Sequence, residues 1–190
     1  KKNIYATEDI KICSKSKFII ISIGTPVNKN NLKPEIENLI NFFYFLKKHI
    51  KNNQTIIIRS SVYPGICEKI FKVLKSKNKN LSYCPERIIQ GKSIIELPKL
   101  PQIVSGFNKT AISNSANLFK KISKKIIYTK VIEAELIKLF SNAYRYIHFS
   151  IANQFYKICE DLDLDFNLIR KNMIDGYSRN KDIPKQGFTA

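Results

Sequence analysis

The sequence lacks the cysteine and histidine patterns of a metal site. Its four cysteines include no C-x-x-C pair, and neither histidine lies at metal-ligand spacing from them. No apolar run approaches the roughly 20 residues of a membrane span, and no signal peptide is present. We therefore expect a cytoplasmic protein with no metal and no membrane partner. Its reduced, buried thiols are expected at Cys13, Cys67, Cys84 and Cys159.

Acidic residues are few beside basic ones, with 15 Asp and Glu against 33 Lys and Arg, and a net charge of +18. A nucleic-acid binder concentrates its basic residues on one face or arm. Here the excess is nearly all Lys and is spread along the chain, together with frequent Ile and Asn and scarce Ala. This combination indicates an AT-rich genome. We expect no nucleic-acid partner, although a positive field can attract an anionic small substrate, and a basic nucleic-acid-binding module remains one alternative.

Apolar, β-branched runs alternate with helical patterns over the first two thirds of the chain. Continuous apolar strands joined by helices are typical of a parallel, doubly wound α/β sheet. Strands are predicted at 18–23, 55–61, 81–86, 102–106 and 126–129, and helices at 34–50, opened by Pro34, at 67–75 and at 109–121.

Polar residues stand at the carboxyl ends of the predicted strands. Thr25 follows the first strand, Ser60 and Ser61 end the second, and Glu86 ends the third. Ligands of doubly wound sheets bind outside these ends. The alternative is that Ser and Thr act there only as turn or cap residues.

A long helix is predicted from Glu133 to about residue 161, followed by a helix at 165–174 and a loop at 177–190. Helices of this length commonly span two domains or build a dimer interface. The spacing places Glu135, Lys138, Asn142 and Arg145 on one face. This face is either solvated, with one Glu–Lys pair, or a site where Lys and Asn hold a water or alkoxide. Asn is a mediocre helix former, which favours the second reading, but periodicity does not decide.

Five ordered motifs resemble the UDP-glucose/GDP-mannose dehydrogenase family, and the resemblance covers essentially the whole chain. Pro85-Glu86-Arg87 is similar to the branch that acts on UDP-N-acetylhexosamines such as UDP-N-acetylmannosamine, and it argues against a simple hydroxy acid as substrate. The motifs occupy residues 22–26, 59–65, 84–88, 133–142 and 151–155, with extensions at 177–180 and 187–189.

The resemblance implies an internal fragment of an NAD-dependent enzyme. Residues 1–130 would form the second half of a Rossmann-like NAD-binding domain, and 131–190 the start of a central helical domain that forms a homodimer through 133–161. Such enzymes oxidise the C6 alcohol of a UDP-sugar to a uronate in two hydride transfers, through a cysteine thioester. The product serves surface polysaccharide synthesis.

The resemblance also implies roles for individual residues. Lys138 and Asn142 would hold the substrate oxygen and the catalytic water, and Glu86 would be the acid/base of thioester hydrolysis. Ser61, in place of the family's frequent Thr, would lie near the nicotinamide, and Thr25 would contact the cofactor. Basic substrate-binding positions are Arg87, Arg145 and Arg179, of which Arg179 resembles an arginine that reaches across the dimer.

The sequence also departs from the family pattern. It contains no G-x-G-x-x-G for the pyrophosphate, and none of its cysteines occupies the nucleophile's place, which is expected just beyond Ala190. Gln90 stands where a second Glu is found, and His148 matches no catalytic position. Since the initiator methionine is missing too, we expect a fragment that is inactive alone. The alternative is a non-catalytic dimerisation or binding remnant.

Overall fold

The structure, a computed structural model, describes residues 4–27, 35–89 and 91–187. The chain divides into two compact units, Lys1–Leu139 and Phe140–Ala190, and each is described by itself. Pro34, Gln90 and residues 188–190, to which the sequence assigned roles, lie outside the described residues.

The first unit is built on a five-stranded sheet whose strands lie side by side in chain order. The first three strands are parallel, the fourth runs antiparallel to the third, and the fifth is parallel to the fourth. The α/β class predicted from the sequence is confirmed. The strands are β1 (Phe18–Ile21), β2 (Thr55–Ile58), β3 (Leu81–Tyr83), β4 (Gln102–Gly106) and β5 (Ile126–Tyr128).

The reversed direction of β4 departs from the all-parallel sheet that the sequence predicted. A parallel return requires a crossover that carries the chain back along a face of the sheet, usually as a helix. Among the described residues between β3 and β4, the only helix is the short α3 (Ser93–Glu96). The chain therefore re-enters the sheet at the end where β3 left it, and Gln102, the first residue of β4, lies at the carboxyl edge of β3.

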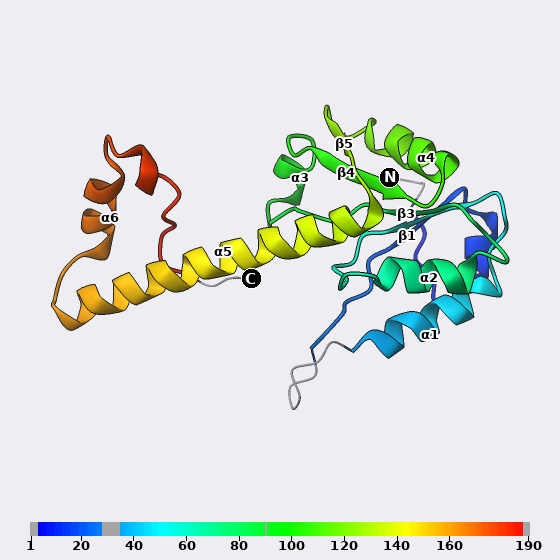
Figure 1. Cartoon of the computed structure of the whole chain (residues 1–190), viewed down its shortest axis with the longest axis horizontal. Coiled ribbons are helices and arrows are strands. Elements are labelled where there is room, and N and C mark those ends of the chain that lie inside the picture. Colours follow the sequence, from blue (N-terminus) through cyan, green and yellow to red (C-terminus); the bar gives the residue numbers. More distant parts are fainter. Residues whose placement is uncertain (1–3, 28–34, 90, 188–190) are drawn as a thin grey trace. The chain divides into compact units, whose positions relative to one another are not determined.

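Helices cover both faces of the sheet (Figure 1). Helices α1 (Ile36–Lys47) and α2 (Ile66–Leu74) pack on one face, and α4 (Lys109–Phe119) packs on the other. Successive residues of β2 are all buried and alternate between these layers: Ile56 and Ile58 belong to the larger core cluster, and Ile57 to the smaller one. This explains the continuous apolar run of that strand.

Several elements depart from the predicted boundaries, and three were not predicted. Strands β1, β2 and β3 end at Ile21, Ile58 and Tyr83, before the predicted residues 23, 61 and 86, and α1 ends at Lys47, before the predicted residue 50. The short η2 (Ser178–Asn180) lies within the predicted loop 177–190. The sequences of the 3₁₀ helix η1 (Ile10–Lys15) and of α3 have no periodic apolar pattern from which a helix could be predicted. Helix α5 (Val131–Asp161) begins before the predicted Glu133. Its first turns belong to the first unit, where Ala134 is buried in the larger core cluster.

The second unit contains the remainder of α5, α6 (Phe166–Ile174) and the short η2 (Ser178–Asn180). Its small core joins Ala152 and Cys159 to Phe166, and the rings of Tyr156 and Phe166 meet edge to face at 6.1 Å. No helix in the described part of the chain combines the length and apolarity needed to cross a membrane.

Candidate functional site

The carboxyl ends of β1 and β2 bring two predicted cofactor-binding residues together. Because these strands are parallel neighbours, their carboxyl ends lie at the same edge of the sheet. There the Thr25 hydroxyl donates a hydrogen bond of 2.6 Å to the backbone carbonyl of Ser61. This bond joins two strand ends 36 residues apart and is neither a local turn nor a helix cap, and the lone pairs of the Thr25 oxygen remain able to accept a further bond.

Ser60 and Ser61 follow β2 directly and differ in their surroundings. Ser61 is half-buried, whereas Ser60 is buried, and its hydroxyl has no hydrogen-bond partner in the described structure. Buried polar atoms normally find a partner. The Ser60 hydroxyl is therefore a polar atom at the carboxyl edge whose hydrogen bond is still to be made.

Glu86 is held by three hydrogen-bond donors. Its Oε1 accepts the backbone N–H groups of Arg87 at 2.8 Å and Ile88 at 3.0 Å. Its Oε2 forms an ion pair with the guanidinium of Arg59. Burial alone raises the pKa of the Glu86 carboxyl, but the hydrogen bond and positive charge of Arg59 and the two backbone donors together lower it below its usual range.

Arg59 is the ion-pair partner of Glu86. The sequence predicted no role for this arginine. Its side chain is only 9% exposed. The guanidinium carbon lies 4.8 Å from the ring centroid of Phe119, and both terminal nitrogens lie 3.4 Å from Oε1 of Gln102. Nothing in the spacing of these residues predicts the cluster, because it depends on the antiparallel direction of β4.

Glu135 is buried, so the solvated-face interpretation of the polar stripe is wrong at this position. Only 1% of the residue is exposed. Its carboxylate accepts the N–H groups of Gly65 at 2.7 Å and Cys67 at 2.9 Å, the first donors of α2. A helix terminus leaves such donors unsatisfied and favours negative charge. Glu135 therefore fastens the start of α5 to α2, and burial together with this carboxylate raises the pKa of the Cys67 thiol well above its ordinary value.

The other predicted site residues on α5 and beyond are divided between the two units. Lys138 and Asn142 are one helical turn apart on α5, with Lys138 half-buried in the first unit and Asn142 exposed in the second. Arg145 is half-buried, and both Lys138 and Arg145 have interaction partners. Arg179 lies on η2 with its guanidinium carbon 4.7 Å from the ring centroid of Tyr177. His148 packs against Tyr144, with ring centroids 4.0 Å apart.

Asn153 joins two of the recognised motifs within the second unit. Its side-chain amide donates to the carbonyl of Gly187 at 2.9 Å and accepts the N–H of the same residue at 2.9 Å. The side chain thus gives Gly187 one donor and one acceptor, as a paired residue on a neighbouring antiparallel strand does. It accounts for an amide residue in the middle of a helix and fixes the backbone at the start of the 187–189 motif.

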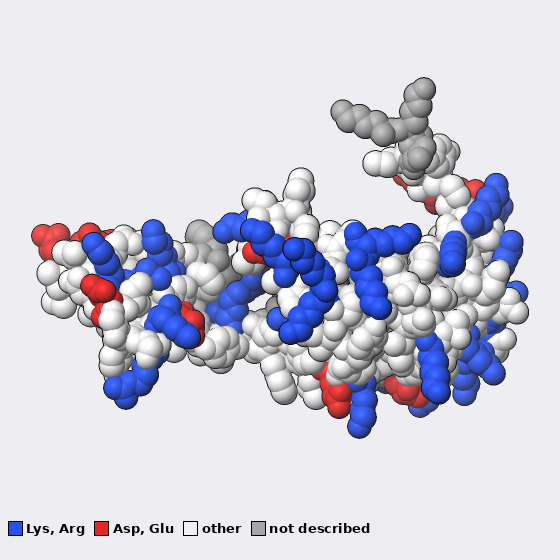
Figure 2. All heavy atoms as spheres, turned by 90° about the horizontal axis from the view of Figure 1, so that it is seen from above, with Lys and Arg blue, Asp and Glu red and all other residues white. Residues whose placement is uncertain are grey.

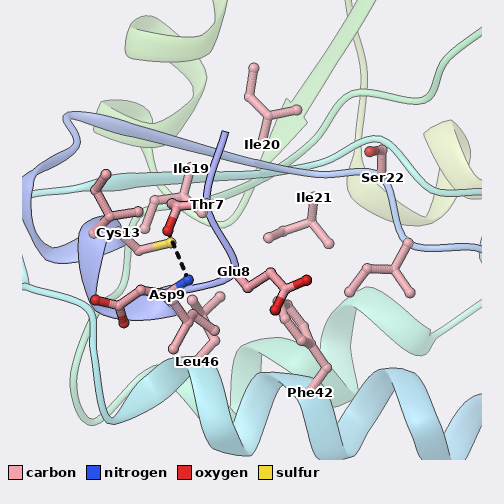
Figure 3. A pocket seen from close by; sticks show the side chains of 13 residues that line it. Thr7, Glu8, Asp9, Cys13, Ile19, Ile20, Ile21, Ser22, Phe42 and Leu46 are labelled. Carbon is pink, nitrogen blue, oxygen red and sulfur yellow. Dashed lines mark hydrogen bonds between the residues drawn. The ribbon is translucent and has the colours of Figure 1, made fainter. Parts of the chain in front are cut away.

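A separate hollow of about 430 Å³ lies beside β1 (Figure 3). It is enclosed by the segment Thr7–Cys13, by β1 and by Phe42 and Leu46 of α1. Six of its thirteen lining residues are isoleucine, and none of the predicted site residues lines it. Among the described residues, no cluster of three or more His, Cys, Asp or Glu side chains is placed to hold a metal ion.

Comparison with known proteins finds two family models that match in tandem. Residues 1–127 match the NAD binding domain of the UDP-glucose/GDP-mannose dehydrogenase family, and residues 132–188 match its central domain. A UDP-N-acetyl-D-mannosamine dehydrogenase from Methanococcus vannielii is 28% identical over 155 residues, 80% of this chain and 36% of that protein. One from Methanococcus aeolicus is 30% identical over 152 residues, 77% of this chain and 35% of that protein.

Solved structures of UDP-N-acetyl-mannosamine dehydrogenases are also similar to this chain. The UDP-N-acetyl-mannosamine dehydrogenase Cap5O from Staphylococcus aureus is similar with a TM-score of 0.73 and 26% identity, over 90% of this chain and 43% of that one. The UDP-D-ManNAc dehydrogenase from Pyrococcus horikoshii shares the fold, with a TM-score of 0.82 and 22% identity over 95% of this chain and 44% of that one. The chain thus spans less than half the length of each of these relatives.

Proposed function

This chain belongs to the UDP-glucose/GDP-mannose dehydrogenase family, and we propose that it supplies one part of an NAD-dependent enzyme that oxidises the C6 alcohol of a UDP-sugar to a uronate. The observation that carries the proposal is that Thr25, Ser61 and Glu86 follow the carboxyl ends of three neighbouring parallel strands, with Thr25 bonded to the backbone of Ser61. Pro85-Glu86-Arg87 and the similarity to UDP-N-acetyl-D-mannosamine dehydrogenases favour a UDP-N-acetylhexosamine as substrate.

NAD is the cofactor that the family's amino-terminal domain binds. The carboxyl edge of the sheet fits part of it, since Thr25 and Ser61 offer hydroxyls there and the buried Ser60 hydroxyl has no hydrogen-bond partner among the residues that the structure describes. The 190 residues contain no G-x-G-x-x-G that would seat the pyrophosphate. In our proposal 1–130 is therefore the second half of the NAD-binding domain. When bound, NAD⁺ supplies the hydride acceptor for each of two oxidation steps.

The remaining roles follow from donor chemistry. In our proposal Lys138 and Asn142 bind the substrate oxygen and a water, because ammonium and amide donors stabilise developing negative charge. Glu86, as the acid/base of thioester hydrolysis, accepts a hydrogen bond from that water. Arg87, Arg145 and Arg179 bind the diphosphate of the substrate and the carboxylate of the product. We further propose that 131–190 begins the central domain, that two copies associate through 133–161, and that the protein is cytoplasmic, in keeping with four unpaired thiols.

Two alternatives differ in class. A remnant would keep the fold and the association but form no NADH. A nucleic-acid-binding module would show an affinity for DNA that falls steeply with salt. Figure 2 favours neither an arm nor a concentrated basic face, because Lys and Arg are scattered over the face in view with Asp and Glu among them.

The test expresses two proteins: the 190-residue chain, and the whole open reading frame that the DNA around it encodes. We expect no NADH from the 190-residue chain with UDP-N-acetylmannosamine. We expect about two NADH per UDP-sugar from the whole frame, and a large loss of that activity with Lys138→Ala. NADH formed by the 190-residue chain alone would refute the fragment proposal. A frame with neither a G-x-G-x-x-G upstream nor a Cys downstream, and no NADH, would establish the remnant.

A further inference from the structure

Arg59 and Glu86 are linked twice across neighbouring strands. Arg59 follows β2 directly and Glu86 lies three residues beyond β3. The Glu86 backbone N–H donates to the Arg59 carbonyl at 3.3 Å, and the two side chains form the ion pair described above. The side chain of Arg59 is 9% exposed and that of Glu86 is 37% exposed. The arginine is therefore the buried member, and the carboxylate is the member that solvent or a substrate can reach.

The guanidinium is itself fixed from two further elements. The ring of Phe119, the last residue of α4, faces it, and Oε1 of Gln102 lies 3.4 Å from both terminal nitrogens. A planar fork held between an aromatic face and the Gln102 oxygen loses little further freedom when it binds a carboxylate. A lysine at this position would supply the charge without the fork.

The acceptor positions of Glu86 can be counted. Each carboxylate oxygen offers about two lone-pair sites. Oε1 uses both for the N–H groups of Arg87 and Ile88, while Oε2 uses one for Arg59 and keeps one. We propose that Arg59 is a positioning residue that holds Glu86 as an ionised acceptor, with a single lone pair on Oε2 left for the hydrogen of a bound water or hydroxyl.

This inference rests on the proposed function and sharpens it, because it selects one of the two roles of an acid/base. A carboxylate held by three donors accepts hydrogen bonds and orients a water through Oε2, while proton donation would first require Glu86 to take up a proton against the positive charge of Arg59. Arg59 itself need not touch the substrate.

Arg59 supplies a hydrogen bond and a positive charge that lower the pKa of the Glu86 carboxyl. The Cys84 thiol also lies within the field of Arg59, but burial raises its pKa to about 12, so that it stays neutral in the relevant range. Gln102 and Phe119, which contact the guanidinium of Arg59, do not titrate.

The test is an NMR titration of ¹³C-labelled glutamate carboxyls in the 190-residue chain, with the Glu86 signal assigned by Glu86→Gln. In the unaltered chain we expect Glu86 to titrate below the ordinary glutamate pKa of about 4.3. Arg59→Met is expected to move the midpoint upward, because burial and the loss of the cation both favour the neutral acid. Arg59→Lys is expected to fall between the two.

Lys72→Met is the matched control, since it removes the cation of the exposed Glu68–Lys72 pair and leaves the Glu86 midpoint unchanged. A midpoint of Glu86 at or above the ordinary value in the unaltered chain overturns the inference, and so does an unchanged midpoint in Arg59→Met. If Arg59→Met does not fold, the Glu86 midpoints of the unaltered chain and of Arg59→Lys test the inference. The titration needs no turnover, so failure of the whole frame to form NADH would sink the proposed function without affecting this result.

Discussion

A single buried carboxylate shows how far a residue's role depends on distant partners. Glu135 lies on the same predicted helix face as Lys138 and Asn142, yet it accepts the first N–H groups of α2 across 70 positions of sequence. The N-cap of α2, Gly65, has φ of 86° and no side chain with which to cap the helix. The capping oxygen that Ser, Thr or Asp usually supplies locally therefore comes from α5.

Replacing Glu135 with Ala leaves two backbone donors of α2 unsatisfied in a buried place. We expect the free energy of unfolding to fall by about 2–3 kcal/mol, the scale of hydrogen bonds to a charged group combined with loss of charge at a helix amino terminus. Urea denaturation followed by circular dichroism measures the difference. Glu37→Ala, on the exposed side of α1, is the control and should change little. Equal losses in the two variants would contradict the capping role.

At the scale of elements, most of the first unit could be predicted from the sequence. Strands β1 and β2 carry unbroken Ile runs, and β4 occupies the predicted 102–106. What escaped prediction depends on contacts that no local pattern encodes: the reversal of β4, the Arg59–Glu86 pair and the burial of Glu135. The order of the motifs predicted the family. The contacts of the site residues could be found only in the folded structure.

The pairing of Asn153 with Gly187 links an element to a segment far along the chain. Asn153→Ala removes both hydrogen bonds at once. We expect the amide hydrogen of Gly187 to exchange with solvent roughly tenfold faster or more, since a single lost bond of about 1–1.5 kcal/mol already gives that factor. Hydrogen–deuterium exchange by NMR measures it. Gln154→Ala, exposed on the same helix, is expected to leave the rate unchanged, and equal rates in all three proteins would refute the clamp.

On the scale of the whole molecule, the two units differ in how well each covers its own apolar side chains. The first unit encloses a core from both faces of its sheet. The second unit buries few residues, and large apolar side chains stand exposed at three- and four-residue intervals along its part of α5. They are Phe140 (66%), Tyr144 (59%), Ile147 (54%), Ile151 (46%), Phe155 (37%) and Ile158 (54%). A continuous stripe of this kind marks an interaction surface.

We propose a second copy of this chain as the partner that covers the stripe, in line with the dimer expected through 133–161. Ile147→Glu with Ile151→Glu should convert the dimer to monomer, because each fully buried isoleucine contributes about 1.5–3 kcal/mol and the variant adds facing charges of one sign. Sedimentation velocity measures the mass. Lys157→Glu changes the charge of the same helix off the stripe, so it controls for charge alone and should leave the dimer intact. A chain that is monomeric without any substitution, or a dimer that survives both glutamates, would show that another surface or another partner covers these residues.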